Sequence, residues 1–209
     1  MLVRALVLAL VLVAGCSSTF TPLPTFPPST RGHTATPSTS APSTTPAPEP
    51  LRVVDYTTPP AVTDIGHSWA GPCVVHGALP DPHCTPGSVG PRPRGEVCVA
   101  GFQAMERPAG IEKAKTDAIR AYGLQNVDRK TIELDHLVPL SIGGSNDASN
   151  LWPQVSDIPG AGFRNKKDAV EASIRAATCP VRGPPRVTLE AAQNAMAHDW
   201  TTAKQVLGI

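Results

Sequence analysis

A tract rich in serine, threonine and proline, residues 17–50, limits how much of this chain can fold. Arg31 and Glu49 are almost its only charged residues. A segment of this composition cannot bury enough apolar surface to offset the entropy lost on ordering, so we expect it to be disordered. Its prolines favour an extended form of roughly 3.1 Å per residue, which suits a stalk. Residues 51–209 remain, enough for one domain of ordinary size.

The N-terminus before this tract predicts export. Arg4 precedes a short apolar run that ends in VAGC, residues 13–16. The run is too short for a permanent membrane helix and its small residues suit cleavage, so residues 1–15 are interpreted as a signal peptide. The VAGC ending resembles the lipobox of bacterial lipoproteins, which implies that Cys16 is acylated and that residues 16–50 tether the domain to a membrane surface without spanning it. The alternative is an ordinary signal peptide cleaved near a cysteine.

Cysteines constrain the fold of the remaining domain. There are four beyond Cys16: Cys73, Cys84, Cys98 and Cys179. An even number in an exported chain predicts two disulfides, and four cysteines allow three pairings. We expect Cys73–Cys84, which would close a proline-rich loop, and Cys98–Cys179, which would tie the start of the domain to its later helices. A zinc site with four thiolates is the alternative, but no C-x-x-C pair is present to support it.

Hydrophobic periodicity predicts an α+β domain with its regular elements in residues 111–209, while residues 51–110, rich in proline and glycine, should be irregular with short strands. The expected elements are a helix over 111–122 that stops at Gly123, a strand over 131–139, a strand over 151–154, a helix over 163–177 and a helix over 188–207 capped by Thr188. The residues expected to face the core are Ile111, Ala114, Ala118, Ile119 and Tyr122, then Trp152, then Ala169, Val170, Ser173 and Ile174, then Leu189, Ala192, Met196, Trp200 and Ala203.

The densest motif is ELDHLVPLSIGGSNDASNLWPQ, residues 133–154. The order of strand, glycine-rich loop, strand and helix should bring four side chains into one neighbourhood, because short connections keep consecutive elements adjacent. These are Asp135, His136, Asn150 and Asn165. Adjacent side chains on a regular strand point to opposite faces. We therefore expect the strand to bend or end beside the Gly143-Gly144 turn, so that Asp135 and His136 can face one site.

This motif, completed by Asn165, resembles the HNH nuclease pattern of the ββα-metal fold. The resemblance extends over about residues 84–200 and implies a small ββα-metal core with flanking helices, braced by disulfides, that hydrolyses phosphodiester bonds. Two departures stand out. Asn165 occupies the place where many members carry histidine, and the zinc-binding cysteine pairs that brace many HNH domains are missing.

The resemblance implies a role for each residue of the pattern. His136 would be the general base, since imidazole accepts a proton near neutral pH. Asp135 and Asn165 would hold a divalent metal, which two oxygen ligands suggest is Mg²⁺ or alternatively Mn²⁺. Asn150 would brace the loop and orient His136. The expected phosphate-binding residues are Arg164, Lys166 and Lys167.

Several readings stay open from sequence alone. Glu133 is either a further ligand or a solvated carboxylate, and Arg107 either a phosphate contact or a surface arginine. His67, His76, His83 and His198 are expected at the surface or in loops. A net charge of +1 gives no basic field that favours nucleic acid, although a local basic patch remains compatible with it.

The function expected is a metal-dependent endonuclease that acts on DNA or RNA outside the cytoplasm and is held to the membrane through lipid on Cys16. No protein partner can be inferred. The alternatives are a binding module that keeps the ββα scaffold without a productive metal, and a structural envelope lipoprotein in which Asp135 and His136 form a buried polar pair.

Overall fold

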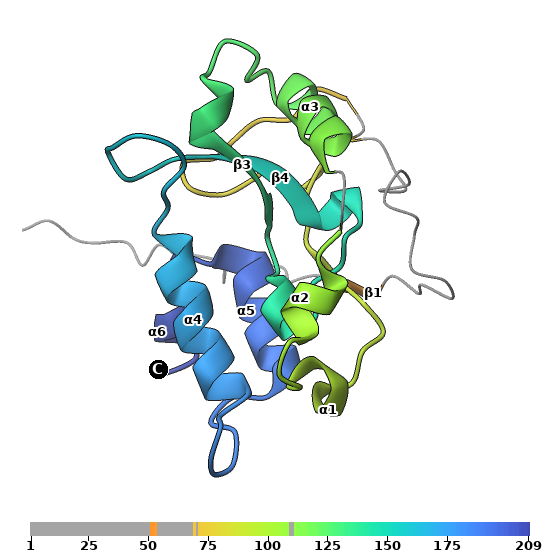
Figure 1. Cartoon of the computed structure of the whole chain (residues 1–209), viewed down its shortest axis with the longest axis vertical. Helices are drawn as coiled ribbons and strands as arrows, with labels where there is room; N and C mark the ends of the chain where they lie inside the picture. Colours follow the sequence, from red (N-terminus) through yellow and green to blue (C-terminus); the bar gives the residue numbers. More distant parts are fainter. Residues whose placement is uncertain (1–50, 54–68, 70, 109–110) are drawn as a thin grey trace, which may run out of the picture. The chain divides into compact units, whose positions relative to one another are not determined.

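The computed structural model describes residues 51–53, 69, 71–108 and 111–209, all within the unit Pro46–Ile209. The predicted signal peptide, the lipidated Cys16, the tether and His67 lie outside these residues. The described part is α+β, as expected (Figure 1). Its strands are β1 (Arg52–Val53), β2 (Ser88–Val89), β3 (Ile132–His136) and β4 (Leu151–Val155). Its α-helices are α1 (Arg94–Val97), α2 (Phe102–Glu106), α3 (Glu112–Ala121), α4 (Lys167–Thr178), α5 (Leu189–Asp199) and α6 (Ala203–Val206).

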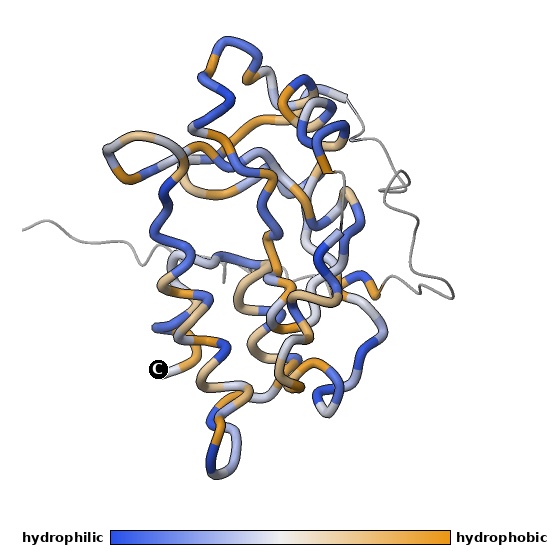
Figure 2. The backbone as a smooth tube through the Cα atoms, in the orientation of Figure 1, coloured by the Kyte–Doolittle hydropathy of each residue, from blue (hydrophilic) through white to orange (hydrophobic). Residues whose placement is uncertain are grey.

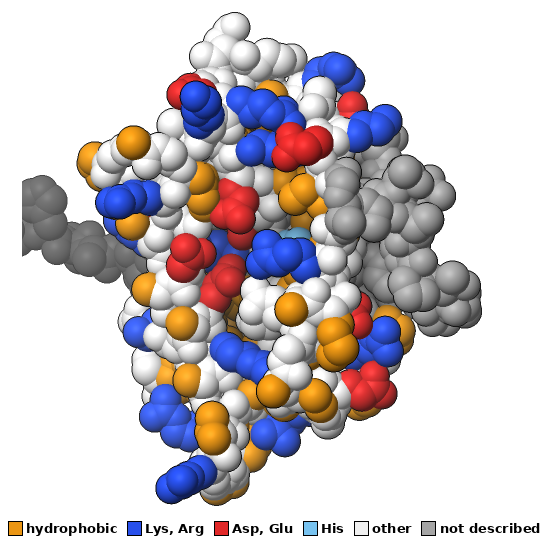
Figure 3. All heavy atoms as spheres, viewed as in Figure 1, with side chains coloured by type: hydrophobic (Ala, Val, Ile, Leu, Met, Phe, Trp, Pro, Cys, Tyr) orange, Lys and Arg blue, Asp and Glu red, His pale blue; other side chains and the backbone are white. Residues whose placement is uncertain are grey.

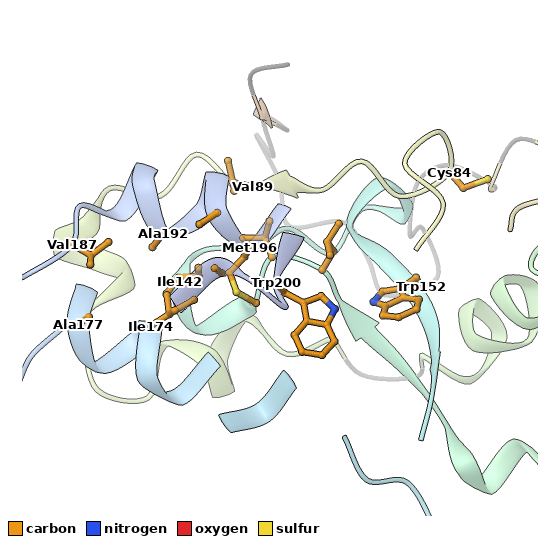
Figure 4. Close-up of a cluster of buried hydrophobic side chains, with 14 of the residues drawn as sticks. Cys84, Val89, Ile142, Trp152, Ile174, Ala177, Val187, Ala192, Met196 and Trp200 are labelled. Carbon is orange, nitrogen blue, oxygen red and sulfur yellow. The ribbon is translucent and has the colours of Figure 1, made fainter. Parts of the chain in front are cut away.

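The antiparallel pair β3–β4 is the centre of this arrangement. Leu134 and Leu151 pack against Ala118 of α3 and so bury one face of the pair. Trp152, the neighbour of Asp135 across the pair, belongs instead to the large core formed with α4 and α5. Figure 4 shows this core, with Met196 close to Ile174 of α4. The order strand, strand, helix predicted for residues 131–177 is therefore confirmed.

The helix boundaries follow local chemistry. Gly123 ends the helical segment after α3 with a φ of 66°, which a residue with a Cβ rarely adopts, so the predicted stop is confirmed. The Thr188 hydroxyl accepts from the N–H of Ala191 at 3.1 Å, which confirms the predicted cap of α5. The predicted helix over 163–177 begins later, at Lys167, because the preceding residues form a loop closed by the side chains of Ser156 and Asp157.

Two further expectations about the helices were wrong. The segment 188–207 is not one helix, because the Asp199 carboxylate accepts from the N–H and the hydroxyl of Thr201 and so competes with the helical bonds. Ala169 is exposed, because the buried stripe of α4 starts at Lys167 and continues through Val170, Ile174 and Ala177. Along the tube of Figure 2, hydrophobic and hydrophilic stretches alternate in α4 and α5, as expected for helices packed on one side.

Both predicted disulfides are present, Cys73–Cys84 and Cys98–Cys179. The second joins the end of α1 to the end of α4, and the guanidinium of Arg94 also donates to the carbonyl oxygen of Thr178 at 3.0 Å. Two disulfides indicate folding in an oxidising, extracytoplasmic compartment. None of the helices in the described ranges is both long enough and apolar enough to cross a membrane.

Residues 71–108 are mostly irregular, as expected, although the short helices α1 and α2 were not predicted. The side chains of His76, His83 and His198 are exposed, as expected.

Candidate active site

The loop between β3 and β4 is organised around the side chain of Asn150. Its carboxamide oxygen accepts from the N–H groups of Val138 (2.9 Å) and Ser88 (3.3 Å), and its nitrogen donates to the carbonyl oxygens of Val138 and Ser145, both at 2.9 Å. Asn150 is fully buried and uses its whole hydrogen-bonding capacity on this loop. The prediction that it braces the loop is confirmed. None of these bonds reaches His136, so any effect of Asn150 on the imidazole passes through the loop that it braces.

The two glycines of the loop are required for different reasons. Gly143 has a φ of 82°, in the left-handed region. Gly144 faces a steric limit, since a Cβ there would lie 1.8 Å from the carbonyl oxygen of Val138. The resulting tight turn returns the chain toward the end of β3 and places Asn146 beside His136.

His136 is the last residue of β3 and is only partly buried. Its Nε2 lies 2.8 Å from Oδ1 of Asn146, and Nδ2 of Asn146 donates to the carbonyl oxygen of Glu106 at 2.9 Å. Because the second bond fixes which end of the Asn146 carboxamide faces the ring, the ring donates from Nε2. Nδ1 of the neutral ring is then left as a proton acceptor. Asn150 was expected to orient His136, and Asn146, the side chain that contacts the ring, was not predicted.

Burial lowers the pKa of His136, while the hydrogen bond with Asn146 and the nearby carboxylate of Asp135 raise it by less. The ring is therefore neutral at neutral pH, the state that a general base requires. His136 and Asp135 share no hydrogen bond among the described contacts, so they are electrostatic neighbours and not a bonded pair.

Asp135 presents its two carboxylate oxygens to different surroundings. Oδ2 lies 2.9 Å from the ammonium of Lys167 and accepts from the indole N–H of Trp152 at 3.2 Å. Oδ1 accepts no hydrogen bond from any described residue, and the side chain keeps 13% exposure. One oxygen is thus fixed by the protein and the other remains open to a ligand.

Lys167 has no exposed surface at its side chain. Its ammonium is shared among three acceptors, the carboxylates of Asp135 and Glu171 and the carbonyl oxygen of His136 at 2.7 Å. The prediction that Lys167 binds phosphate is therefore wrong, because all three of its N–H donors are used inside the protein. The helical spacing of Lys167 with Val170 and Ile174 could have predicted its burial, because all three lie on the side of α4 that faces the core.

The ion pairs around Lys167 perturb both partners. Burial alone would lower the pKa of Lys167, but the carboxylates of Asp135 and Glu171 raise it above its usual value, so the ammonium stays charged. Burial raises the pKa of Glu171 to about 7, against the opposing effect of Lys167. This cluster ties the first turns of α4 to the end of β3.

Asn165 caps α4. Its Oδ1 accepts from the N–H of Asp168 at 2.8 Å and its Nδ2 donates to the Asp168 carboxylate at 3.2 Å. It is 7% exposed and forms no hydrogen bond with Asp135 or His136 in the described part of the chain. Its amide oxygen thus already serves the helix, which the sequence motif did not reveal.

Charged side chains gather at this part of the surface. Burial raises the pKa of Glu133, and the carboxylates of Asp135 and Asp168 raise it further. Arg107 is exposed and near enough to Glu133 and His136 to act on the pKa of both. Figure 3 shows acidic side chains beside lysine and arginine side chains on one face, with a small area of histidine between them. The side chains of Arg164 and Lys166 are also exposed.

In comparison with known proteins, no protein-family model, no curated protein and no solved structure matches the chain. The resemblance to HNH nucleases therefore rests on the motif residues alone.

Proposed function

We propose that this protein is a metal-dependent endonuclease that hydrolyses phosphodiester bonds of nucleic acid outside the cytoplasm. The observation that carries the proposal is the arrangement at the end of β3, where a partly exposed imidazole has its donor nitrogen fixed by Asn146, and where the preceding residue, Asp135, keeps one carboxylate oxygen that accepts no described hydrogen bond. A general base and a hard oxygen ligand side by side are what cleavage by an activated water requires.

In this proposal Nδ1 of His136 takes a proton from a water molecule as that water attacks phosphorus. The bond from phosphorus to the 3′ oxygen breaks, and the departing oxygen receives a proton from solvent. The products carry 5′-phosphate and 3′-hydroxyl ends, as the resemblance implies. Asn146 holds the imidazole in one tautomer and stabilises the protonated ring that forms. Lys167 acts indirectly, by fixing Oδ2 of Asp135.

The donors near Asp135 fit a hard divalent cation, since they are carboxylate and amide oxygens. Asp135 would hold the ion through Oδ1, whereas the amide oxygen of Asn165, the second ligand of the expected pair, already accepts from the N–H of Asp168. When bound, Mg²⁺ or Mn²⁺ would offset the negative charge that develops on the phosphate. In the described ranges, no three side chains of His, Cys, Asp or Glu are grouped as a metal site. Water and substrate oxygens would therefore complete the coordination.

The phosphate contacts need to be reassigned within this proposal. Arg164 and Lys166 stay in the expected role, because both are exposed. Arg107 replaces Lys167, because it is exposed and acts on the pKa of His136. An exposed guanidinium near the general base can hold a phosphate oxygen with two donors.

Degradation of plasmid DNA and of RNA by the mature protein with Mg²⁺ or Mn²⁺ tests the proposal. His136→Ala should lower the rate by at least 100-fold, a loss at the low end of that expected for a general base. The matched control is His198→Ala, which replaces an exposed histidine and should leave the rate unchanged. Equal activity of the wild type and His136→Ala would refute the proposal.

One observation favours a second candidate, a binding module without catalysis. The ammonium of Lys167 already neutralises part of the charge that Asp135 would offer to a metal. A ligand that binds only the native state raises thermal stability by mass action. If none of Mg²⁺, Mn²⁺ and Ca²⁺ raises Tm at millimolar concentration, the binding module is the better conclusion.

A further inference from the structure

One face of the β3–β4 pair carries three oxygen-bearing side chains. Glu133 and Asp135 are two residues apart on β3 and so lie on the same face. Gln154 of β4 is the register partner of Glu133, and directly opposed residues of an antiparallel pair also share a face. These three positions are therefore neighbours on the side of the pair that Asp135 shares with α4.

Gln154 has a polar atom that the protein does not satisfy. The side chain is 2% exposed, and its Oε1 is buried without a hydrogen-bond donor, although every other buried side-chain oxygen or nitrogen in the described residues except the Thr178 hydroxyl has a partner. A buried carboxamide oxygen is costly to leave without a partner, so a bound water or ion is expected at this atom.

The charge around Gln154 indicates what kind of ligand is missing. The nearby side chains Glu133, Asp135 and Asp168 are all acidic, and mutual repulsion among these carboxylates is one reason that the pKa of Glu133 is raised. Among these three carboxylates, the ammonium of Lys167 contacts only that of Asp135, through Oδ2. Arg107 and Lys167 lower the pKa of Glu133, but each by less than either of the two carboxylates raises it. The remaining negative charge favours a cation.

We infer that Glu133, Oδ1 of Asp135 and Oε1 of Gln154 form a binding site for a hard divalent cation on this face of the β3–β4 pair. This inference rests on the proposed function for the role of the ion, and it changes the ligand set, because Asn165 is assigned to the cap of α4. Two carboxylates and one carboxamide oxygen are a donor set that suits Mn²⁺, Mg²⁺ or Ca²⁺ and not zinc.

Titration of the mature protein with Mn²⁺, followed by the electron paramagnetic resonance signal of the free ion, tests the site without reference to activity. Glu133→Gln and Gln154→Met keep the size of each side chain while removing a charge or an oxygen. Each should weaken the Kd for Mn²⁺ by fivefold or more. The matched control is Asn165→Ser, which retains a capping hydroxyl but lacks the amide oxygen, and should change the Kd by less than twofold.

Gln154→Met also has a readout that does not require metal. Because it removes a buried oxygen without a partner, the metal-free variant should have a Tm no lower than that of the wild type, which shows that it folds. A wild-type protein that does not bind Mn²⁺ would overturn the inference, as would a loss below fivefold in either of the two variants. The inference would also be overturned if Asn165→Ser weakened Mn²⁺ binding more than both Glu133→Gln and Gln154→Met did.

Parallel assays of nucleic-acid degradation separate this inference from the proposed function. If Mn²⁺ binds through these donors but no nucleic acid is cut, the cation site stands and the nuclease proposal fails. If nucleic acid is cut while Glu133→Gln and Gln154→Met bind Mn²⁺ normally, the nuclease proposal stands and the site assigned here is wrong.

Discussion

Replacing Lys167 by methionine should destabilise the protein strongly, because the change removes a buried ammonium that serves two carboxylates. Lys167 has no exposed surface, while the side chains of Asp135 and Glu171 are 13% and 19% exposed. Removing one partner of a buried ion pair costs about 3–5 kcal/mol. Since both carboxylates keep some contact with solvent, we expect the lower value, about 3 kcal/mol at pH 8. For a domain of this size that corresponds to a fall in Tm of roughly 10 °C.

The cost of Lys167→Met should also depend on pH. With Lys167 present, burial raises the pKa of Glu171 to about 7. Without the ammonium this pKa rises further, so at pH 5.5 Glu171 is neutral and needs no counter-ion. Because the wild-type pKa is already about 7, the two proteins differ in the charge of Glu171 only between about pH 7 and pH 8, so the variant's penalty should be at most about 1.4 kcal/mol smaller at pH 5.5 than at pH 8.

Urea unfolding of the two proteins at pH 5.5 and pH 8 measures both effects. Lys166→Met is the matched control, since Lys166 is the exposed neighbour and its loss should change the free energy of unfolding by less than about 0.5 kcal/mol. The double variant Lys167→Met/Glu171→Gln should recover stability at pH 8, because it no longer buries the unpaired Glu171 carboxylate. If Lys167→Met and Lys166→Met lose the same small amount, Lys167 is not a buried counter-ion and the reasoning is refuted.

Three other outcomes follow from the structure. Gly144→Ala places a Cβ 1.8 Å from a carbonyl oxygen, so it should lower Tm far more than Gly123→Ala. At Gly123 the space is open, and only the positive φ costs about 1 kcal/mol. Similar losses of Tm in the two variants would contradict the steric argument. Replacing both cysteines of Cys98–Cys179, which are separated by 81 residues, should lower the free energy of unfolding by about 4.5 kcal/mol in denaturant titrations. The same change at Cys73–Cys84, separated by 11, should lower it by about 3 kcal/mol. The opposite order would show that chain entropy is not the dominant effect. The pKa of Glu171 is raised from 4.5 to about 7, so between these pH values the native state binds more protons than the unfolded state. The free energy of unfolding should therefore fall as pH rises through this range, by at most roughly 3 kcal/mol. Glu171→Gln should flatten this part of the plot of stability against pH, and an unchanged slope would exclude Glu171 as its source.

The predictions that succeeded rest on local or covalent signals. Gly123 and Thr188 mark helix ends through backbone conformation and capping, which depend only on neighbouring residues. The strand pair and the following helix are encoded by periodicity. The disulfide pairing agreed with the expectation that a short loop and a long-range link would be formed.

The assignments that failed depend on contacts across the fold. Lys167 was expected to bind phosphate, but it is buried. Lysine is rarely buried, and only its partners Asp135 and Glu171 make the burial tolerable. Asn150 was expected to orient His136, and Asn146 was missed as its partner, because that contact depends on where the tight Gly-Gly turn returns the chain. The orphaned oxygen of Gln154 has no sequence signature, because it is defined by the absence of a donor in a packed interior.

The disulfide between Cys98 and Cys179 makes the order of the candidate site depend on the redox state of the compartment that holds the protein. It fastens the irregular early segment to the far end of the helix whose first turn holds Asp135 through Lys167. Before export both thiols would be reduced, and the chain would lack this fastening inside the cell that makes it. If the protein cuts nucleic acid, it should therefore be inactive toward the nucleic acid of the producing cell until it has been exported and oxidised. Assaying the thiol and oxidised forms side by side would measure that safeguard, and full activity in the thiol form would exclude it.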